Sequence, residues 1–285
     1  MLEFKNIGKS YRDDFWAKKF WALKDISFTI KPGKIVGFLG ANGAGKTTSL
    51  KILMGFSKAS RGEVKFSSSL GKNREEQLSN IGYLPERPYF YPHLTARQFI
   101  HYMAKLNEIN HRLILDRLDF WGKKFEIDFA LDKKLHSFSK GMLQRVGLIT
   151  ALIHDPKLII LDEPLSGLDP VGRKIIKDAL VDLNKEGKTI FFSSHIVSDI
   201  EETCQDIVIL EKGNMIYQGE ISRLLQDDAG EVEFRYKLGS EIIKIDSKAN
   251  RQREILKEIE SKGGVLLSFI PKLKSLEEVV YQVKD

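Results

Sequence analysis

A glycine-rich run that begins at Gly40 has the residue types and spacing needed to hold a chain of phosphates. Residues 40–48 read G-A-N-G-A-G-K-T-T, which fits the pattern G-x-x-x-x-G-K-[ST]. The glycines let the backbone curl until several N–H groups point at one anion. We expect the phosphate contacts from Gly40, Asn42, Gly43, Ala44, Gly45, Lys46, Thr47 and Thr48. Lys46 can reach the outer phosphates, and the Thr47 hydroxyl can ligate Mg²⁺.

Two adjacent acids, Asp162 and Glu163, directly follow the apolar run at residues 158–161. In a doubly wound sheet, ligands bind at the carboxyl ends of the strands. We therefore expect Asp162 to hold Mg²⁺, directly or through water, and Glu163 to polarise a water that attacks the terminal phosphate. Alone, such a pair would more simply be two acids that open a loop. The glycine-rich run favours the catalytic interpretation.

The elements that must position these residues are strands that alternate with helices. Apolar or alternating runs predict strands at residues 34–39, 62–66, 81–84, 158–161, 189–193 and 207–210. Helical patterns cover residues 47–54 and 171–185, and residues 95–154 are predicted to be mainly helical. This alternation predicts an α/β fold with a mainly parallel sheet that is covered on both faces.

The two ends of the chain differ from this pattern. Residues 2–8 and 22–30 alternate like two paired strands, which predicts an N-terminal antiparallel β subdomain joined by an aromatic loop. The character changes again near Gly219, where strands at 231–236, 241–246 and 264–270 and helices at 250–262 and 275–282 are predicted. We therefore expect a main domain at 1–220, with a helical subdomain at about 86–155, and a small accessory α+β subdomain at 221–285.

The composition is that of a soluble globular protein of 285 residues, 42% hydrophobic and 29% charged. No apolar run approaches the roughly 20 residues that span a bilayer, and the first residues read as a strand, not as a signal peptide. The lone Cys204 excludes an intramolecular disulfide. The net charge of +6 could favour an anionic membrane face or nucleic acid, but composition alone favours a solvated mixed-charge surface.

Further motifs follow in a fixed order along the chain. Residues 138–142 read F-S-K-G-M, residues 164–169 read P-L-S-G-L-D, and His195 follows the apolar run at 189–193. With the glycine-rich run and the two acids, this order resembles the ATP-binding subunit of an ABC transporter, over residues 2 to about 220. The resemblance implies an Mg-dependent ATPase that sandwiches ATP between two copies. It also implies a separate transmembrane permease at the cytoplasmic face of the plasma membrane, and no nucleic-acid partner.

The same resemblance implies roles for individual residues. Ser139 and Gly141 stand in the signature motif, which meets the γ-phosphate bound by the opposite subunit. Asp169 stands where the family contacts the partner's phosphate loop. His195 matches the switch histidine beside the γ-phosphate, and Tyr11 matches the aromatic that stacks on adenine. From local chemistry alone, Ser139 and Asp169 are also predicted to cap the helices that follow them.

The chain departs from the family pattern at several positions. The family's metal-binding glutamine is replaced by Glu86, which can still ligate Mg²⁺. A Pro-Glu pair here, and a tail of this kind, resemble bacterial exporters of drugs, antibiotics or polysaccharides. The signature motif differs from the family at three positions, Phe138, Lys140 and Met142.

Several alternatives remain open from the sequence. The ring on adenine could also come from the aromatic loop, whose aromatic residues are Phe15, Trp16, Phe20 and Trp21. The aromatic run at 87–94 could receive a helix of the permease or pack locally. An ABC ATPase acting on nucleic acid or ribosomes is the alternative function. A GTPase is disfavoured because residues 184–187 do not form the Asn-Lys-x-Asp guanine reader, and a kinase would not need the signature motif.

Overall fold

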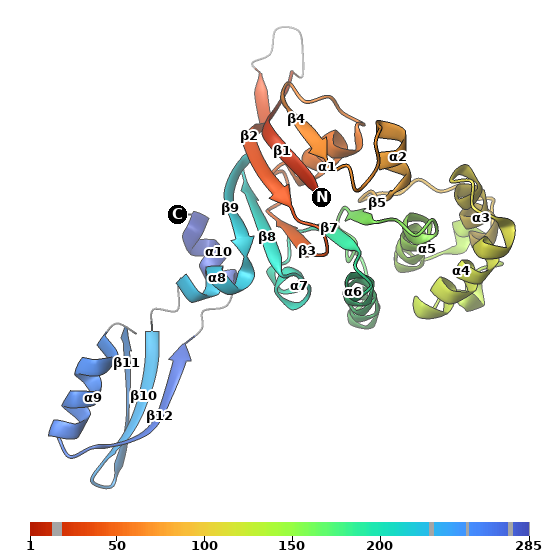
Figure 1. Cartoon of the computed structure of the whole chain (residues 1–285). Helices are drawn as coiled ribbons and strands as arrows, with labels where there is room; N and C mark the ends of the chain where they lie inside the picture. Colours follow the sequence, from red (N-terminus) through yellow and green to blue (C-terminus); the bar gives the residue numbers. More distant parts are fainter. Residues whose placement is uncertain (13–18, 228–230, 249–250, 273–275, 285) are drawn as a thin grey trace. The chain divides into compact units, whose positions relative to one another are not determined.

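The computed structural model describes residues 1–12, 19–227, 231–248, 251–272 and 276–284 (Figure 1). The chain divides into two compact units, Met1–Gln218 and Gly219–Asp285. The first unit holds every residue for which a catalytic or binding role is predicted. Each unit is described separately below.

A six-stranded sheet runs through the first unit in the order β5-β6-β7-β3-β8-β9. Its strands are β3 (Ile35–Leu39), β5 (Ile81–Leu84), β6 (Leu158–Leu161), β7 (Thr189–Ser194), β8 (Asp206–Glu211) and β9 (Asn214–Glu220). The pairs from β5 to β8 are all parallel, which confirms the predicted mainly parallel sheet. The edge strand β9 was not predicted. It follows β8 through Lys212 and Gly213, both at positive φ, as in a tight antiparallel hairpin.

A second, three-stranded sheet has the order β2-β1-β4 and is antiparallel, as predicted. Its strands are β1 (Leu2–Tyr11), β2 (Phe20–Ile30) and β4 (Arg61–Phe66). The first two strands are longer than the alternation predicted. Tyr11 pairs directly with Phe20, so part of the expected aromatic loop is strand.

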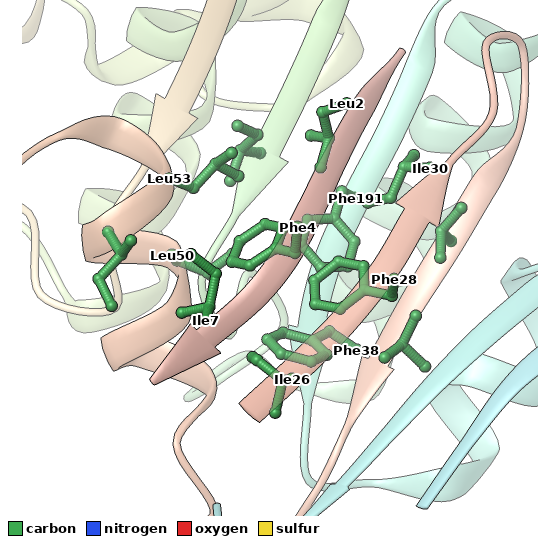
Figure 2. Close-up of a cluster of buried hydrophobic side chains, with 14 of the residues drawn as sticks. Leu2, Phe4, Ile7, Ile26, Phe28, Ile30, Phe38, Leu50, Leu53 and Phe191 are labelled. Carbon is green, nitrogen blue, oxygen red and sulfur yellow. The ribbon is translucent and has the colours of Figure 1, made fainter. Parts of the chain in front are cut away.

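The main core lies between the two sheets, where β1, β2 and helix α1 (Lys46–Met54) cover one face of the parallel sheet (Figure 2). Phe4 stacks on Phe28 with ring centroids 4.3 Å apart. Phe38 of β3 packs against Phe191 of β7 at 5.0 Å. These contacts fix the two strands whose carboxyl ends lead into the glycine-rich loop and into His195.

Helices α5 (Lys140–Leu152), α6 (Pro170–Lys185) and α7 (Val197–Thr203) cover the opposite face of the parallel sheet (Figure 1). Glycines in the strands allow these helices to pack close to the sheet. A Cβ on Gly37 would lie 2.6 Å from a methyl of Ile200 in α7, and one on Gly82 would lie 2.2 Å from the Ala151 carbonyl oxygen in α5. The predicted cover on both faces is therefore confirmed.

The predicted helical region consists of α3 (Ala96–Leu106), α4 (His111–Lys124), two 3₁₀ turns (Asp128–Ala130 and Leu135–Ser137) and α5. Thr95 caps α3 as predicted, because its hydroxyl accepts from the Gln98 N–H while the Gln98 side chain accepts from the Thr95 N–H. The short helix α2 (Arg74–Ser79) was not predicted. Over the described ranges, every helix is too short or too polar to cross a bilayer.

The second unit has a three-stranded antiparallel sheet in the order β11-β10-β12. Its elements are α8 (Ile221–Asp227), β10 (Glu231–Leu238), β11 (Glu241–Lys248), α9 (Gln252–Ser261), β12 (Val265–Lys272) and α10 (Leu276–Lys284). Ile255 and Ile259 of α9 pack on Phe234 of β10. The β-β-α-β-α order matches the expectation, and α8 is an addition to it. The predicted first residues of the last two helices, 250 and 275, lie outside the described residues.

Candidate active site

The glycine-rich loop joins the end of β3 to the start of α1 and is pressed against its neighbours. Gly43 and Gly45 have φ of +83° and +110°, which favours glycine at both positions. A Cβ on Gly45 would also lie 2.5 Å from Leu23 of β2, and one on Gly40 would lie 2.6 Å from the Leu210 carbonyl oxygen. Sequence and packing therefore both require glycine in a loop with this shape.

A pocket of about 440 Å³ opens in front of this loop. Its lining residues are Tyr11, Phe20, Ala22, Ala41, Asn42, Gly43, Gly45, Lys46, Thr47, Thr48, Glu86 and Glu163. The structure thus brings the predicted loop residues together with the proposed base Glu163 and the aromatic Tyr11. Two other predicted loop residues, Gly40 and Ala44, belong to the same loop but are not among the lining residues.

Lys46 is the buried cation of the pocket, with 5% of the residue exposed. Its ammonium donates a 2.6 Å hydrogen bond to the Gly40 carbonyl and lies 3.2 Å from Oε1 of Glu163. Removing a cation from water is costly unless it is paired and hydrogen-bonded. The loop carbonyl and the carboxylate meet this requirement, and both hold the ammonium at the pocket wall.

Asp162 is fully buried at the carboxyl end of β6. Its Oδ1 accepts a 2.6 Å hydrogen bond from the Ser193 hydroxyl, and its Oδ2 has no hydrogen-bond partner. Burial raises the pKa of Asp162, the hydrogen bond from Ser193 and the nearby Thr47 hydroxyl lower it, and the charges of Glu86 and Glu163 raise it. A buried carboxylate oxygen without a partner, close to a threonine hydroxyl, suits a hard cation such as Mg²⁺.

Protein ligands alone would not complete such a metal site. Across the described ranges, no group of three or more His, Cys, Asp or Glu side chains could hold a metal ion. Mg²⁺ usually keeps several waters and takes one or two carboxylates together with substrate phosphates. The residues present therefore fit a metal that arrives with a nucleotide.

Glu163 and His195 lie side by side, as their predicted roles require. Oε2 of Glu163 is 2.9 Å from Nδ1 of His195, which directly follows β7. Glu163 adopts a left-handed backbone conformation, with φ of +50°. Non-glycine residues rarely adopt this conformation, and those that do are often found at functional sites. The unusual backbone of Glu163 and its buried side chain are both typical of functional positions.

Ser139 and Asp169 cap helices, as local chemistry predicted. Ser139 accepts a 3.2 Å hydrogen bond from the Met142 N–H at the start of α5. Asp169 accepts a 3.0 Å bond from the Gly172 N–H at the start of α6, where Pro170 takes the first position. Among the described lining residues of the phosphate pocket, neither of them appears, and Gly141 does not appear either. The structure therefore does not bring these three residues to the pocket of their own chain.

Two aromatic residues face the pocket from paired strands. Tyr11 and Phe20 are direct neighbours across β1 and β2, and both line the pocket. Trp21 has another contact, because the guanidinium of Arg61 lies 5.1 Å from the centre of its ring. The remaining alternatives for the adenine contact, Phe15 and Trp16, lie outside the described residues.

A sequence model of the ABC transporter family matches residues 23–166, just over half of the chain. The chain belongs to the ABC transporter family. This ABC protein is 43% identical over 236 residues to a Synechocystis protein named uncharacterized ABC transporter ATP-binding protein sll0415. The match covers 81% of the chain but only 66% of that relative. A Bacillus subtilis relative, the uncharacterized ABC transporter ATP-binding protein YxlF, is 32% identical with 99% of both chains covered.

Solved structures show the same ABC fold. One is the dimeric ATP-binding cassette MJ0796 in a post-hydrolysis state, bound to ADP and phosphate. It matches with a TM-score of 0.70 at 25% identity, covering 78% of this chain and 99% of the cassette. The present chain therefore carries an ABC ATPase domain that binds ATP.

Two residues of this ATPase site had no predicted role, Ser193 and Gln144. The Ser193 hydroxyl accepts from the Glu163 N–H at 2.9 Å and donates to Asp162. The buried Gln144 amide of α5 donates to the Pro164 carbonyl at 3.0 Å and approaches the Glu163 carbonyl at 3.5 Å. The sequence signal for Ser193 was a hydroxyl near the end of an apolar strand, and the signal for Gln144 was an amide within an apolar helix.

Proposed function

We propose that the protein is the ATP-hydrolysing subunit of an exporter and drives a separate transmembrane permease at the cytoplasmic face of the plasma membrane. The observation that carries this proposal is that Lys46 and Glu163 meet at one pocket of about 440 Å³, with His195, which is not itself a lining residue, 2.9 Å from the Glu163 carboxylate. Export is favoured by the Pro85-Glu86 pair and by the tail, both of which resemble the exporter subgroup. We keep 1–220 as the ATPase domain and 221–285 as the accessory subdomain.

Binding would begin with the phosphates. The loop at residues 40–45 surrounds the chain of phosphates, and the N-terminus of α1 adds partial positive charge behind it. Lys46 would exchange its contact with Glu163 for the outer phosphates. Tyr11 or Phe20, on the paired strands at the pocket rim, would stack on the adenine.

Hydrolysis would then use Glu163 as a general base. Glu163 accepts a proton from a water as the water oxygen attacks the γ-phosphorus, and the bond to the ADP oxygen breaks. His195, 2.9 Å from the same carboxylate, would orient it and steady the water. A placed base of this kind is worth about 10²–10⁴-fold in rate.

Three residues would hold Mg²⁺ together with the phosphates, namely Thr47, Asp162 and Glu86. The unpartnered Oδ2 of Asp162 and the position of Glu86 at the pocket support this assignment. When bound, Mg²⁺ neutralises charge on the phosphates and helps to orient them. A carboxylate at Glu86 adds negative charge near the phosphates, so this site should depend strongly on the metal.

A second copy of the chain would complete each site. Ser139, Gly141 and Asp169 are exposed or half-buried near helix starts away from their own pocket, where a facing copy can meet them. The dimeric assembly of the similar cassette supports this arrangement. ATP would then lie between the glycine-rich loop of one copy and the Ser139 end of α5 of the other.

The Glu163→Gln variant tests this proposal. It should bind ATP, lose about 10²–10⁴-fold in turnover, and accumulate as a nucleotide-bound dimer in size-exclusion chromatography with light scattering. The matched control is Glu186→Gln, at the end of α6 and outside the pocket, which should behave like the wild type. Retained turnover in Glu163→Gln would remove Glu163 as the base.

A second experiment tests the partner. Co-expression with the membrane protein encoded by a neighbouring gene should yield a complex whose ATPase activity changes with transport substrate. Salt-sensitive stimulation of the ATPase by nucleic acid, without any effect of a permease, would instead favour the alternative function on nucleic acid or ribosomes.

A further inference from the structure

The hydroxyl of Ser193 touches both acids of the active site at once. Ser193 is fully buried near the end of β7, next to the bulky apolar residue Phe192. Its Oγ accepts a 2.9 Å hydrogen bond from the Glu163 N–H and donates a 2.6 Å bond to Oδ1 of Asp162. One side chain of β7 thus holds, by two hydrogen bonds, the two acids that directly follow the neighbouring strand β6.

The contact with Asp162 determines which carboxylate oxygen is available. A hydroxyl has one proton to donate, and Ser193 gives it to Oδ1. Oδ2 is left buried without a hydrogen-bond partner. The carboxylate is therefore fixed in one orientation with one oxygen reserved for another ligand. This arrangement is how an outer-shell residue orients a metal-binding carboxylate.

The contact with Glu163 fixes its backbone. The left-handed conformation of Glu163, at φ of +50°, costs free energy and persists only where the surroundings impose it. Ser193 holds the N–H of this residue, and Gln144 holds the carbonyl of the next residue, Pro164, at 3.0 Å. Hydrogen bonds on both sides keep the Glu163 side chain directed toward Lys46 and His195.

We propose that Ser193 is a positioning residue for ATP hydrolysis. Its single hydroxyl aligns Asp162 for the metal and holds the Glu163 peptide in the conformation that faces the phosphates. The inference rests on the proposed roles of Asp162 and Glu163, and it adds a residue that neither the motifs nor the pocket lining includes.

A matched control lies on the same strand. Thr189, at the start of β7, is also fully buried, and its hydroxyl accepts a 2.9 Å hydrogen bond from the Gly33 N–H. Ser193→Ala and Thr189→Val each remove one buried hydroxyl from β7. Loss of a buried hydrogen bond should lower the melting temperature of both variants to a similar extent. Only Ser193→Ala should alter the active site.

The test combines three measurements on the full chain. Steady-state ATPase assays should show kcat reduced about 10- to 100-fold in Ser193→Ala, with KM for ATP within about twofold of the wild type. Mn²⁺ affinity of the ADP complex, from electron paramagnetic resonance of free Mn²⁺, should fall about 10-fold. Amide exchange of the segment at 162–166 should accelerate. Thr189→Val should match the wild type in all three.

Equal behaviour of the two variants in these measurements would overturn the inference. The Mn²⁺ and exchange data do not need turnover, so they separate this inference from the role of Glu163. If Glu163→Gln hydrolysed ATP normally, the proposed base would fail, while a lower Mn²⁺ affinity in Ser193→Ala would still support the positioning of Asp162. Should Ser193→Ala not fold, Ser193→Cys offers a side chain of similar volume with a weaker hydrogen-bond donor. Its kcat and Mn²⁺ affinity should lie between those of the wild type and those expected for Ser193→Ala. Wild-type values in Ser193→Cys would overturn the inference.

Discussion

The ammonium of Lys46 lies 3.2 Å from Oε1 of Glu163, so the proposed phosphate-binding cation and the proposed base share one contact. Both side chains are nearly buried, so bulk water screens their attraction weakly. An incoming phosphate must therefore compete with Glu163 for the same ammonium.

This competition predicts tighter nucleotide binding when the charge of Glu163 is removed. Glu163→Gln should bind ADP about fivefold more tightly, because about 1 kcal/mol of ion pairing no longer opposes the phosphates. Isothermal titration with ADP measures this without hydrolysis. Lys46→Ala should show the opposite effect and weaken binding, whereas Lys51→Ala, an exposed lysine of α1, should not. Weaker ADP binding by Glu163→Gln would contradict the competition.

The rim of the pocket predicts which aromatic residue holds adenine. Tyr11→Ala and Phe20→Ala should each weaken ATP binding, and stacking of a base on an aromatic ring is worth about 1–3 kcal/mol. Trp21→Ala is the control, because its ring contacts Arg61. Fluorescence titration with a labelled ATP analogue would rank the three. A loss in Trp21→Ala alone would show that the ring contact with Arg61 is exchanged for adenine.

The buried charge of Asp162 predicts a conflict between stability and activity. Because burial raises the pKa of Asp162, its negative charge costs more free energy in the native state than in the unfolded chain. Asp162→Asn removes this cost and keeps an oxygen for the Ser193 hydroxyl. We expect the melting temperature to rise by at least about 2 °C while ATPase activity is lost. A lower melting temperature in Asp162→Asn would show that the charge stabilises the fold.

The pH dependence of that variant follows from the same shift. As pH falls toward the unfolded pKa, native Asp162 takes up its proton before the unfolded chain does, so the wild type gains stability from this group. Asp162→Asn lacks this gain. Its stability advantage should therefore shrink between neutral pH and about pH 4, as measured by urea unfolding.

His154 predicts a pH effect of the opposite sign. Burial lowers the pKa of His154, whose Nε2 lies 3.1 Å from the Ile81 carbonyl oxygen. Below the unfolded pKa of about 6.5, the unfolded chain takes up a proton that the native state refuses, so the free energy of unfolding falls with pH. His154→Gln should flatten this slope between about pH 7.5 and pH 5.5. The exposed His136→Gln should leave it unchanged.

Much of the fold was readable from local patterns. The apolar run at 158–161 is β6 with the same ends, and the Asp169-Pro170 pair predicted the start of α6. Helix α7 was not predicted because its N-cap residue, Ile196, has no side-chain oxygen that would indicate a helix start. Helix α2 does carry such a signal, since the Asn73 side chain accepts a hydrogen bond from the Glu76 N–H.

The sequence predicted those parts of the candidate site that are contiguous in the chain. It did not predict contacts between residues that are far apart in the chain. The phosphate loop and the two acids each occupy one short stretch of sequence. The contact between Ser193 and Asp162 joins residues 31 positions apart and exists because β6 and β7 are neighbours in the sheet. Spacing alone does not give strand order, so this partner required the structure.

Helix α5 spans the distance between two kinds of contact. Ser139 caps its first turn, and the Gln144 amide holds the Pro164 carbonyl behind Glu163. Five residues of helix are a rigid rod of about 7.5 Å. In the proposed dimer, ATP bound at one site would therefore affect the position of the catalytic carboxylate of the other site. The two sites should then hydrolyse ATP cooperatively. A Hill coefficient for ATP of 1 in the assembled dimer would show that helix α5 does not couple the two sites.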